Sequence, residues 1–190
     1  MKEYGDEGFI NLLREEREET VKNIKDGTVL VAGENIDFQE REVLQGKMWM
    51  WMPDGFGPLS KELARLKYPN ENRPDVIYTN QETTVNITFS HKRETLKEGQ
   101  EEEIRGYMKE IVEKVQPASE MLEAGTVEAE KGRLAWFDFV TPAIDTDIYN
   151  LMFFSALKGR LLIGSCNCLK EDYEDWKGLF LQMLGTVRHA

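Results

Sequence analysis

The sequence predicts an α+β protein, a three-layer α/β/α sandwich with a central, mostly antiparallel sheet. Three observations support this prediction. The run Met48–Met52, MWMWM, is apolar at every position, which favours a strand in a sheet that is covered on both sides. Several later strands are joined by hairpin turns, which makes neighbouring strands antiparallel. Two amphipathic segments, Lys97–Met121 and Asp172–Val187, are predicted to be the helices that cover the sheet.

Composition restricts the class of protein and its partners. The chain has 190 residues, of which 41% are hydrophobic and 31% charged, as in a globular domain. Its formal net charge of −11 should repel nucleic-acid phosphates and anionic lipid surfaces. No apolar run reaches the length of about 18 residues that a membrane span needs, and the first residues do not form a secretory signal. We therefore expect a cytoplasmic protein that binds neither nucleic acid nor membrane.

The first third of the chain is predicted to contain a helix and short strands. Glu7–Lys25 has two apolar clusters separated by charges, which predicts a surface helix or arm that ends at Asp26-Gly27. We expect this helix or arm to occupy residues 1–27 and one α+β domain to occupy residues 28–190. Strands are expected at Thr28–Val31, Ile36–Leu44 and Met48–Met52, with a break at Gly33-Glu34-Asn35 and a two-residue turn at Gln45-Gly46.

A turn-rich loop, Pro53–Pro58, follows the Met/Trp strand and matches no phosphate-binding glycine motif. Ser60 is placed to cap a short helix that runs to about Lys67, before Pro69. In Thr84–Ser90 apolar and polar residues alternate, which predicts a half-buried strand near an edge of the sheet. The remaining strands are expected at Val76–Tyr78, Thr126–Glu130, Leu134–Val140, Ile148–Leu157 and Leu161–Leu169.

This order of elements resembles that of the Mog1/PsbP-like superfamily, which includes small bacterial members of unassigned role. The resemblance extends over about Ile36–Val187. Its motif content is Met52-Pro53-Asp54-Gly55-Phe56 before the short helix, and the segment Trp176 to Val187 in the terminal helix. It implies a three-layer sandwich and a role in binding other proteins, because one eukaryotic branch contacts a small GTPase and the plant branch docks on photosystem II. No contact residue of either branch matches a residue here.

Residue types that usually carry catalysis are sparse. His91 closes a predicted strand and is expected to be exposed, and His189 lies in the predicted tail, so neither forms an evident dyad. Cys166 and Cys168 would share one strand face. We expect two buried free thiols, because a disulfide between them would be strained and a zinc site lacks a second cysteine pair. The sequence thus predicts no cofactor, no metal and no enzymatic activity.

Three aspartates need separate consideration. Asp138 lies between Phe137 and Phe139 in an apolar strand. A buried carboxylate there would have a raised pKa suited to acid–base chemistry, whereas the structural alternative is a pair with Arg133 or another cation. Asp145 and Asp147 lack the other oxygen ligands of a calcium loop, and we interpret them as turn residues.

The leading functional hypothesis is a non-enzymatic protein-interaction or accessory domain, a monomer or weak dimer with a basic partner. The acidic residues expected to meet that partner are Glu101, Glu102, Glu103 and Glu110 on the long helix and Glu15, Glu16, Glu18 and Glu19 on the N-terminal helix. The alternative is that these charges bind no partner and only keep the protein soluble. The alternative is a small-molecule pocket between sheet and helix near residues 53–58. Its candidate ligand-binding residues are Trp49, Trp51, Phe56 and Asp138. An enzyme that uses Asp138 or His91 is the third hypothesis.

Overall fold

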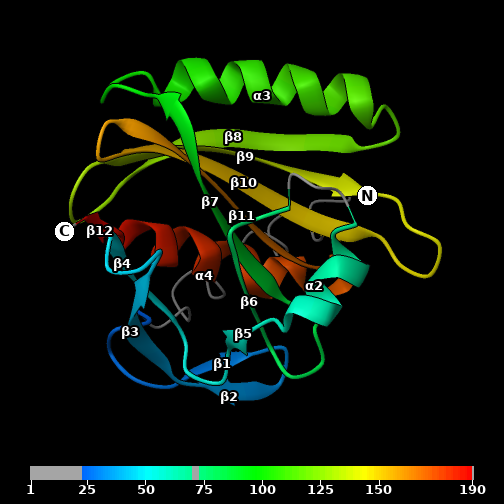
Figure 1. Cartoon of the computed structure of the whole chain (residues 1–190). Coiled ribbons are helices and arrows are strands. Elements are labelled where there is room, and N and C mark those ends of the chain that lie inside the picture. The colour runs from blue at the N-terminus through cyan, green and yellow to red at the C-terminus, as the bar shows by residue number, and fades with distance from the viewer. Residues whose placement is uncertain (1–22, 70–72, 190) are drawn as a thin grey trace, which may run out of the picture.

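The computed structural model describes residues 23–69 and 73–189. Its main sheet has seven antiparallel strands in the order β5-β6-β7-β11-β10-β9-β8. Helix α3 (Glu101–Val115) covers one face, and helix α4 (Tyr173–Gly185) covers the other (Figure 1). The strands are β5 (Gly57–Pro58), β6 (Val76–Thr79), β7 (Asn86–Thr95), β8 (Glu120–Glu128), β9 (Arg133–Thr141), β10 (Ile148–Leu157) and β11 (Arg160–Leu169). The predicted α+β sandwich with a mostly antiparallel sheet is confirmed.

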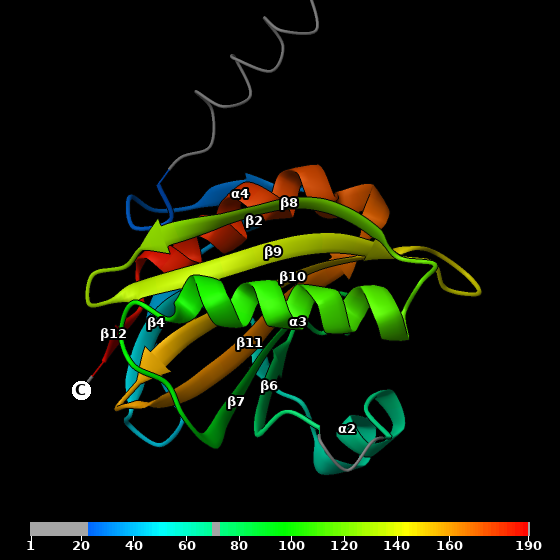
Figure 2. The ribbon, with the colours of Figure 1, turned by 90° about the horizontal axis from the view of Figure 1, so that it is seen from above.

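Two smaller sheets lie on the α4 side of the main sheet (Figure 1). One is the hairpin of β1 (Val29–Val31) and β2 (Glu34–Ile36). The other has the order β12-β4-β3, with β3 (Phe38–Val43), β4 (Met48–Pro53) and β12 (Arg188–His189). A short helix, α2 (Lys61–Lys67), precedes β6, and a 3-10 turn, η1 (Lys170–Asp172), precedes α4. Seen from above, α3 lies along β9 and β10, while α2 lies beyond β6 and β7 (Figure 2).

The two faces of the main sheet have separate apolar cores. The core under α4 contains Tyr149 and Phe153 of β10 together with the apolar stripe of α4, which is Trp176, Leu179, Phe180, Met183 and Leu184. The core under α3 contains Phe137 and Phe154, which stack with ring centroids 5.9 Å apart, and Val112 of the helix. Each helix therefore buries one apolar stripe against alternate residues of the same strands.

The predicted place of the Met/Trp strand was wrong. Strand β4 is the middle strand of the small sheet and not part of the main sheet. Met48, Met50 and Met52 are fully buried in the core, but Trp49 and Trp51 on the opposite face are only half-buried. On that face two cations lie over the tryptophan rings. The Arg188 guanidinium lies 4.7 Å from a Trp49 ring centroid, and the Lys25 ammonium lies 5.7 Å from that of Trp51.

Strand β7 is internal, and the prediction that Thr84–Ser90 is half-buried was wrong. It lies between β6 and β11 and continues to Thr95. Its polar residues Asn86 and Thr88 are buried because β11 supplies their partners. Asn86 Nδ2 donates to Asn167 Oδ1 at 2.9 Å, and the Thr88 hydroxyl lies 2.8 Å from that of Ser165. Satisfied hydrogen bonds thus allow a polar strand face to be buried.

Several predicted boundaries were also displaced. The helical signal over Lys97–Met121, in which Pro117 is expected to end or kink the regular helix, corresponds to a helix over Glu101–Val115 that ends just before Pro117, and residues from Glu120 onward form edge strand β8. The turn between β3 and β4 spans Leu44 to Lys47, with left-handed backbone at its first three residues, and is longer than two residues. The predicted break at residues 33–35 is limited to the Ala32-Gly33 turn, because Glu34 begins β2. In contrast, Ser60 caps α2, and Lys158-Gly159 forms the predicted two-residue hairpin turn.

The first described residues reach the core. The predicted helix over Glu7–Lys25 lies, up to residue 22, outside the described residues, while Ile24 and Lys25 form a turn. Ile24 is buried, and its amide donates to Gln182 Oε1 of α4 at 3.1 Å. The division of the chain at residue 27 stays a prediction. Within the described ranges, no helix has the length and apolar character needed to cross a membrane.

Candidate functional site

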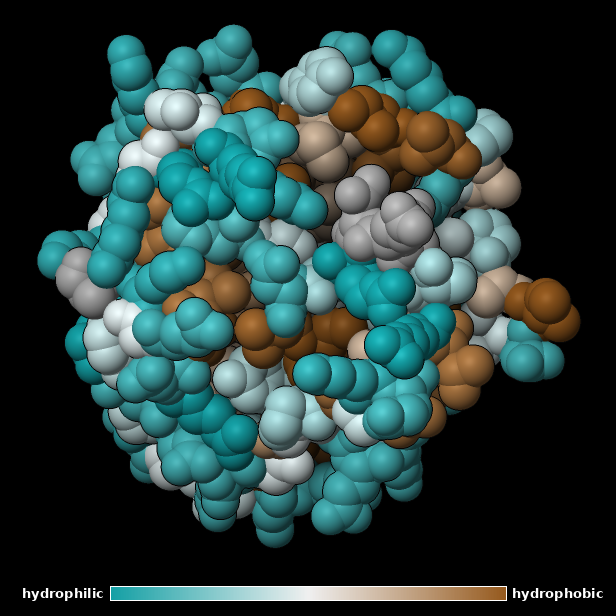
Figure 3. Space-filling view, viewed as in Figure 1, coloured by the Kyte–Doolittle hydropathy of each residue, from teal (hydrophilic) through white to brown (hydrophobic). Residues whose placement is uncertain are grey.

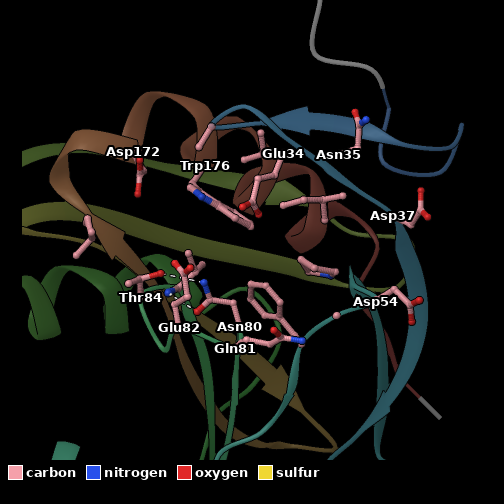
Figure 4. A pocket seen from close by; sticks show the side chains of 18 of the residues that line it. Glu34, Asn35, Asp37, Asp54, Asn80, Gln81, Glu82, Thr84, Asp172 and Trp176 are labelled. Atoms are coloured by element: carbon pink, nitrogen blue, oxygen red, sulfur yellow. Dashed lines mark hydrogen bonds between the residues drawn. The ribbon is translucent and has the colours of Figure 1, made fainter.

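A cavity of about 650 Å³ opens between the β1–β2 hairpin, the loop of residues 53–56, the turn of residues 80–85 and the start of α4. Six carboxylates line it, and we call it the acidic cleft: Glu34, Asp37, Asp54, Glu82, Glu171 and Asp172. The lining residues that the structure describes include no lysine or arginine. Figure 4 shows Glu34 and Trp176 pointing into the space above the 80–84 turn, with Asp37 and Asp54 on one side. The face of the molecule in Figure 3 is mostly hydrophilic, with separate apolar areas.

Arg41 of β3 fixes the loop that contributes Asp54 and Phe56. Its guanidinium donates to the backbone carbonyls of both residues. A guanidinium nitrogen also lies 3.7 Å from Asp54 Oδ1, so this carboxylate is partly neutralised. The Asp54 amide donates to the carbonyl of Asp37 at 2.8 Å, which joins the loop to the segment between β2 and β3. One wall of the cleft is therefore held by several independent hydrogen bonds.

The turn of residues 80–85 is organised by Asn80. Its Oδ1 accepts from the Val85 amide at 3.0 Å, and its Nδ2 donates to Thr84 Oγ1 at 2.9 Å (Figure 4). Thr83 has left-handed backbone with φ of 59°, which this closed turn requires. The turn presents Glu82 at the cleft, and no ion pair of Glu82 occurs among the described residues.

Two buried aromatic residues form the base of the cleft. Phe56 and Trp176 have ring centroids 5.9 Å apart, and Trp176 stacks on Phe180 at 5.4 Å. These contacts connect the loop to α4, so the cleft is bounded by packed elements rather than by free loops. The sequence analysis places a possible pocket near the loop Pro53–Pro58, and residues 53–56 of this loop line the acidic cleft.

Burial and neighbouring negative charges both act on Asp172 of the cleft. Burial raises the pKa of Asp172 above its usual range, and the neighbouring charges of Glu171 and Asp175 raise it further. A cation in the cleft would oppose this effect, because it would stabilise the ionised carboxylates. The site is therefore suited chemically to a positively charged group.

The structure does not bring the four predicted ligand-binding residues together. Phe56 lines the acidic cleft, but Trp49 and Trp51 lie on the outer face of β4. Asp138 is completely buried on β9 and belongs to a hydrogen-bonded cluster outside the cleft. Its cation is Lys177 and not Arg133, which pairs with Glu102 and Glu128.

The four predicted partner-binding glutamates on α3 differ in exposure. Glu101 is only 3% exposed, and its Oε2 accepts from the Gly99 amide at 2.8 Å. Glu102 pairs with Arg105 and Arg133, and Glu110 pairs with Lys114. Glu103 is exposed. The other predicted set, Glu15, Glu16, Glu18 and Glu19, lies outside the described residues.

Two predictions about the histidines were wrong. His91 lies within β7 and not at its end, with Nε2 3.0 Å from the Leu157 carbonyl and Nδ1 3.4 Å from Lys47 Nζ. His189 belongs to strand β12 rather than to a solvated tail. Burial lowers the pKa of both rings.

The remaining candidates have structural surroundings. Cys166 and Cys168 are free and buried, as expected, and burial raises the pKa of both thiols. Asp147 pairs with Lys170 at 3.4 Å in the loop before β10. No group of His, Cys, Asp and Glu side chains that could hold a metal ion occurs in the part of the chain that the structure describes.

Sequence reasoning missed most of the cleft. Glu34, Glu82 and Glu171 lie in turns or short strands that are far apart in the chain, and acidic residues are ordinary in such positions. Only the loop of residues 53–58 carried a local signal. The convergence of the carboxylates depends on how the small hairpin packs beside α4, which periodicity does not specify.

No protein-family model matches the chain, and no curated protein matches it in sequence. Its structure is similar to that of cyanobacterial PsbP from Synechocystis sp. PCC 6803, with a TM-score of 0.59 and 11% identity over 80% of this chain and 92% of that chain. It is also similar to the Ran-binding protein Mog1p of Saccharomyces cerevisiae, with a TM-score of 0.52 and 12% identity over 81% of this chain and 96% of that chain. The chain described here therefore has the Mog1/PsbP-like fold.

Proposed function

We propose that this protein is a non-enzymatic interaction module and that its acidic cleft receives a basic segment of a partner protein. The observation that carries the proposal is the cleft itself, where six carboxylates from separate segments line one cavity and no lysine or arginine occurs among the described lining residues. Complementary charge accelerates encounter and fixes the orientation of a partner. The fold is compatible with this role, since Mog1p is described as Ran-binding.

The cleft is better suited to this role than the α3 surface. On α3, Glu101 is buried, and Glu102 and Glu110 already have cationic partners. In the cleft, Glu34, Glu82 and Glu171 are exposed and form no ion pair with another described residue. Free carboxylates supply more net attraction to a cation than paired ones do. A cytoplasmic setting fits the proposal, because the two free cysteines need no oxidising compartment.

The experiment compares three forms of the protein as bait for affinity capture and mass spectrometry. The cleft variant carries Glu34→Gln, Glu82→Gln and Glu171→Gln. The matched control carries Glu103→Gln, Glu110→Gln and Glu113→Gln on exposed positions of α3, so both variants lose the same charge. We expect a protein that wild type and the control retain and the cleft variant loses.

Association kinetics then test the charge argument directly. The rate constant of the captured partner, measured by stopped-flow, should fall with salt for wild type and the control, and should be lower for the cleft variant at low salt. The proposal is wrong if the cleft variant retains the same partners with the same rates, or if only the α3 control loses them.

A small organic cation is the second candidate for the same site. Phe56 and Trp176 at the base of the cleft favour it, because buried rings beside carboxylates suit a ligand with both charge and apolar surface. Spermidine is a suitable probe. A rise in melting temperature that is present in wild type and absent in the cleft variant would support a small ligand over a protein segment.

A further inference from the structure

A second cavity lies at the end of the main sheet where the chain terminates. It has a volume of about 500 Å³ and receives residues from the β7–α3 connection, the β8–β9 turn, the β10–β11 turn and β12. Both ribbon views show these turns at the same end of the sheet as β12 (Figures 1 and 2). The residues that line it are Thr95, Leu96, Lys97, Glu98, Lys131, Ala156, Lys158, Gly159 and His189, and we call it the basic pocket.

The charge of the basic pocket is opposite to that of the whole protein. The chain has 35 acidic and 24 basic residues, yet three lysines and one glutamate line this cavity. Lysines elsewhere are often paired, as Lys170 is with Asp147. In the described structure, Lys97, Lys131 and Lys158 form no ion pair. Three exposed lysines that line one cavity give it a positive charge, which favours a multiply charged anion.

His189 adds a polar group that lacks a partner. Its Nε2 is buried and has no hydrogen-bond partner among the residues that the structure describes. Burial lowers the pKa of the ring, the charges of Lys131 and Lys158 lower it further, and Glu98 opposes them. Lys131 and Lys158 therefore act on this ring electrostatically, although they lie on different hairpin turns. An unsatisfied buried nitrogen is costly unless a further acceptor or donor reaches it.

We propose that the basic pocket binds the phosphate group of a small phosphate monoester. Such a group carries nearly two negative charges at neutral pH and has three acceptor oxygens, which suits three lysine ammonium groups and the Thr95 hydroxyl. Leu96 and Ala156 are buried and supply an apolar wall. A cavity of about 500 Å³ is larger than a phosphate ion, so the organic part of the ligand also has room.

The test uses the whole protein with ¹⁵N labels, titrated with phenyl phosphate and, separately, with inorganic phosphate at constant ionic strength. One variant carries Lys131→Gln and Lys158→Gln. The matched controls are Lys61→Gln and Lys61→Gln combined with Lys92→Gln, which remove one or two lysines outside the pocket. Circular dichroism spectra and melting curves establish that all variants fold.

We expect saturable amide shifts at residues 95–98, 131, 156–159 and 189, and tighter binding of phenyl phosphate than of inorganic phosphate. Loss of two charge-assisted contacts should weaken binding about tenfold or more in the pocket variant, with little change in the controls. The absence of saturable shifts, equal affinity in the pocket variant and the controls, or the same shifts with sodium chloride would overturn the site. Equal affinity for the two phosphates would overturn the monoester assignment. All outcomes are independent of the acidic cleft.

Discussion

Lys177 of α4 donates a hydrogen bond to Asp138 of β9, with Nζ 2.7 Å from Oδ2. Asp138 is completely buried, and it also accepts from the Tyr149 hydroxyl at 2.8 Å and from the Glu123 amide at 2.6 Å. The Lys177 ammonium lies 5.5 Å from a ring centroid of Trp136. Burial lowers the pKa of Lys177, but the hydrogen bond and charge of Asp138, with those of Glu123, raise it overall. This cluster connects α4 to strands β9 and β10 of the main sheet.

Lys177→Met should destabilise the protein by about 3 kcal/mol, because it leaves a buried carboxylate without its cation. Urea unfolding followed by circular dichroism measures the change. Lys170→Met is the control, since its pair with Asp147 is exposed and is worth less than about 1 kcal/mol. The double variant Asp138→Asn with Lys177→Met should be more stable than the sum of the single losses predicts. Equal effects of Lys177→Met and Lys170→Met would contradict the role of the cluster.

Gly164→Ala should destabilise the protein by about 1–3 kcal/mol or more. A Cβ at this position of β11 would lie 2.0 Å from Cζ of Phe153, the residue that it faces on β10 in a fully buried part of the core. Gly178→Ala on α4 is the matched control, because its added Cβ would meet no described atom within 4 Å apart from the adjoining helix backbone. That change should stabilise the helix by about 0.5–1 kcal/mol. Thermal melts of the two variants should therefore shift in opposite directions.

Met50→Ala should cost more stability than Trp51→Ala. Met50 is fully buried, and truncation of a buried methionine costs about 2–5 kcal/mol. Truncation of a fully buried tryptophan costs about 3–5 kcal/mol, but Trp51 is half-buried and its indole faces Lys25, so its loss should be smaller. Chemical denaturation of both variants gives the comparison. A larger loss for Trp51→Ala would mean that the outer face of β4 is covered more completely than the structure indicates.

Stability should fall as the pH falls through the histidine range, with a contribution from His91. Burial lowers the pKa of this ring below its ordinary value of 6.5, and the charges of Arg160 and Lys47 lower it further. The unfolded state then binds the proton more tightly than the folded state. The contribution of His91 is therefore present above pH 6.5 and is lost as the pH falls through the lowered folded value.

The measurement is the free energy of unfolding of wild type and His91→Gln at about pH 5 and about pH 7.5. Wild type should lose more stability at the lower pH than the variant does, because glutamine does not titrate. His189→Gln should also reduce the slope, since burial lowers the pKa of His189. If the slope of wild type matches that of both variants, the two rings do not couple to folding.

Local patterns in the sequence were sufficient for the long elements. The strands at Ile148–Leu157 and Arg160–Leu169 and the helix at Tyr173–Gly185 follow the predicted ranges closely. In each, apolar periodicity extends over ten or more residues, and a turn such as Lys158-Gly159 marks the end. The predicted α+β sandwich and the Mog1/PsbP-like fold depended on these elements and on their order.

Tertiary structure decided where the short elements lie and which side chains they bring together. The five apolar residues of Met48–Met52 specify a strand, but not the sheet that it joins, because cations cover its tryptophan face. Asn86 and Thr88 are the polar residues of the alternating strand Thr84–Ser90, and they are buried because β11 supplies their hydrogen-bond partners. The acidic cleft unites carboxylates from four segments. The sequence alone determined the long elements through local periodicity. Contacts between distant segments, which no local pattern encodes, decided the sheet of β4, the burial of the polar face of β7 and the two charged cavities.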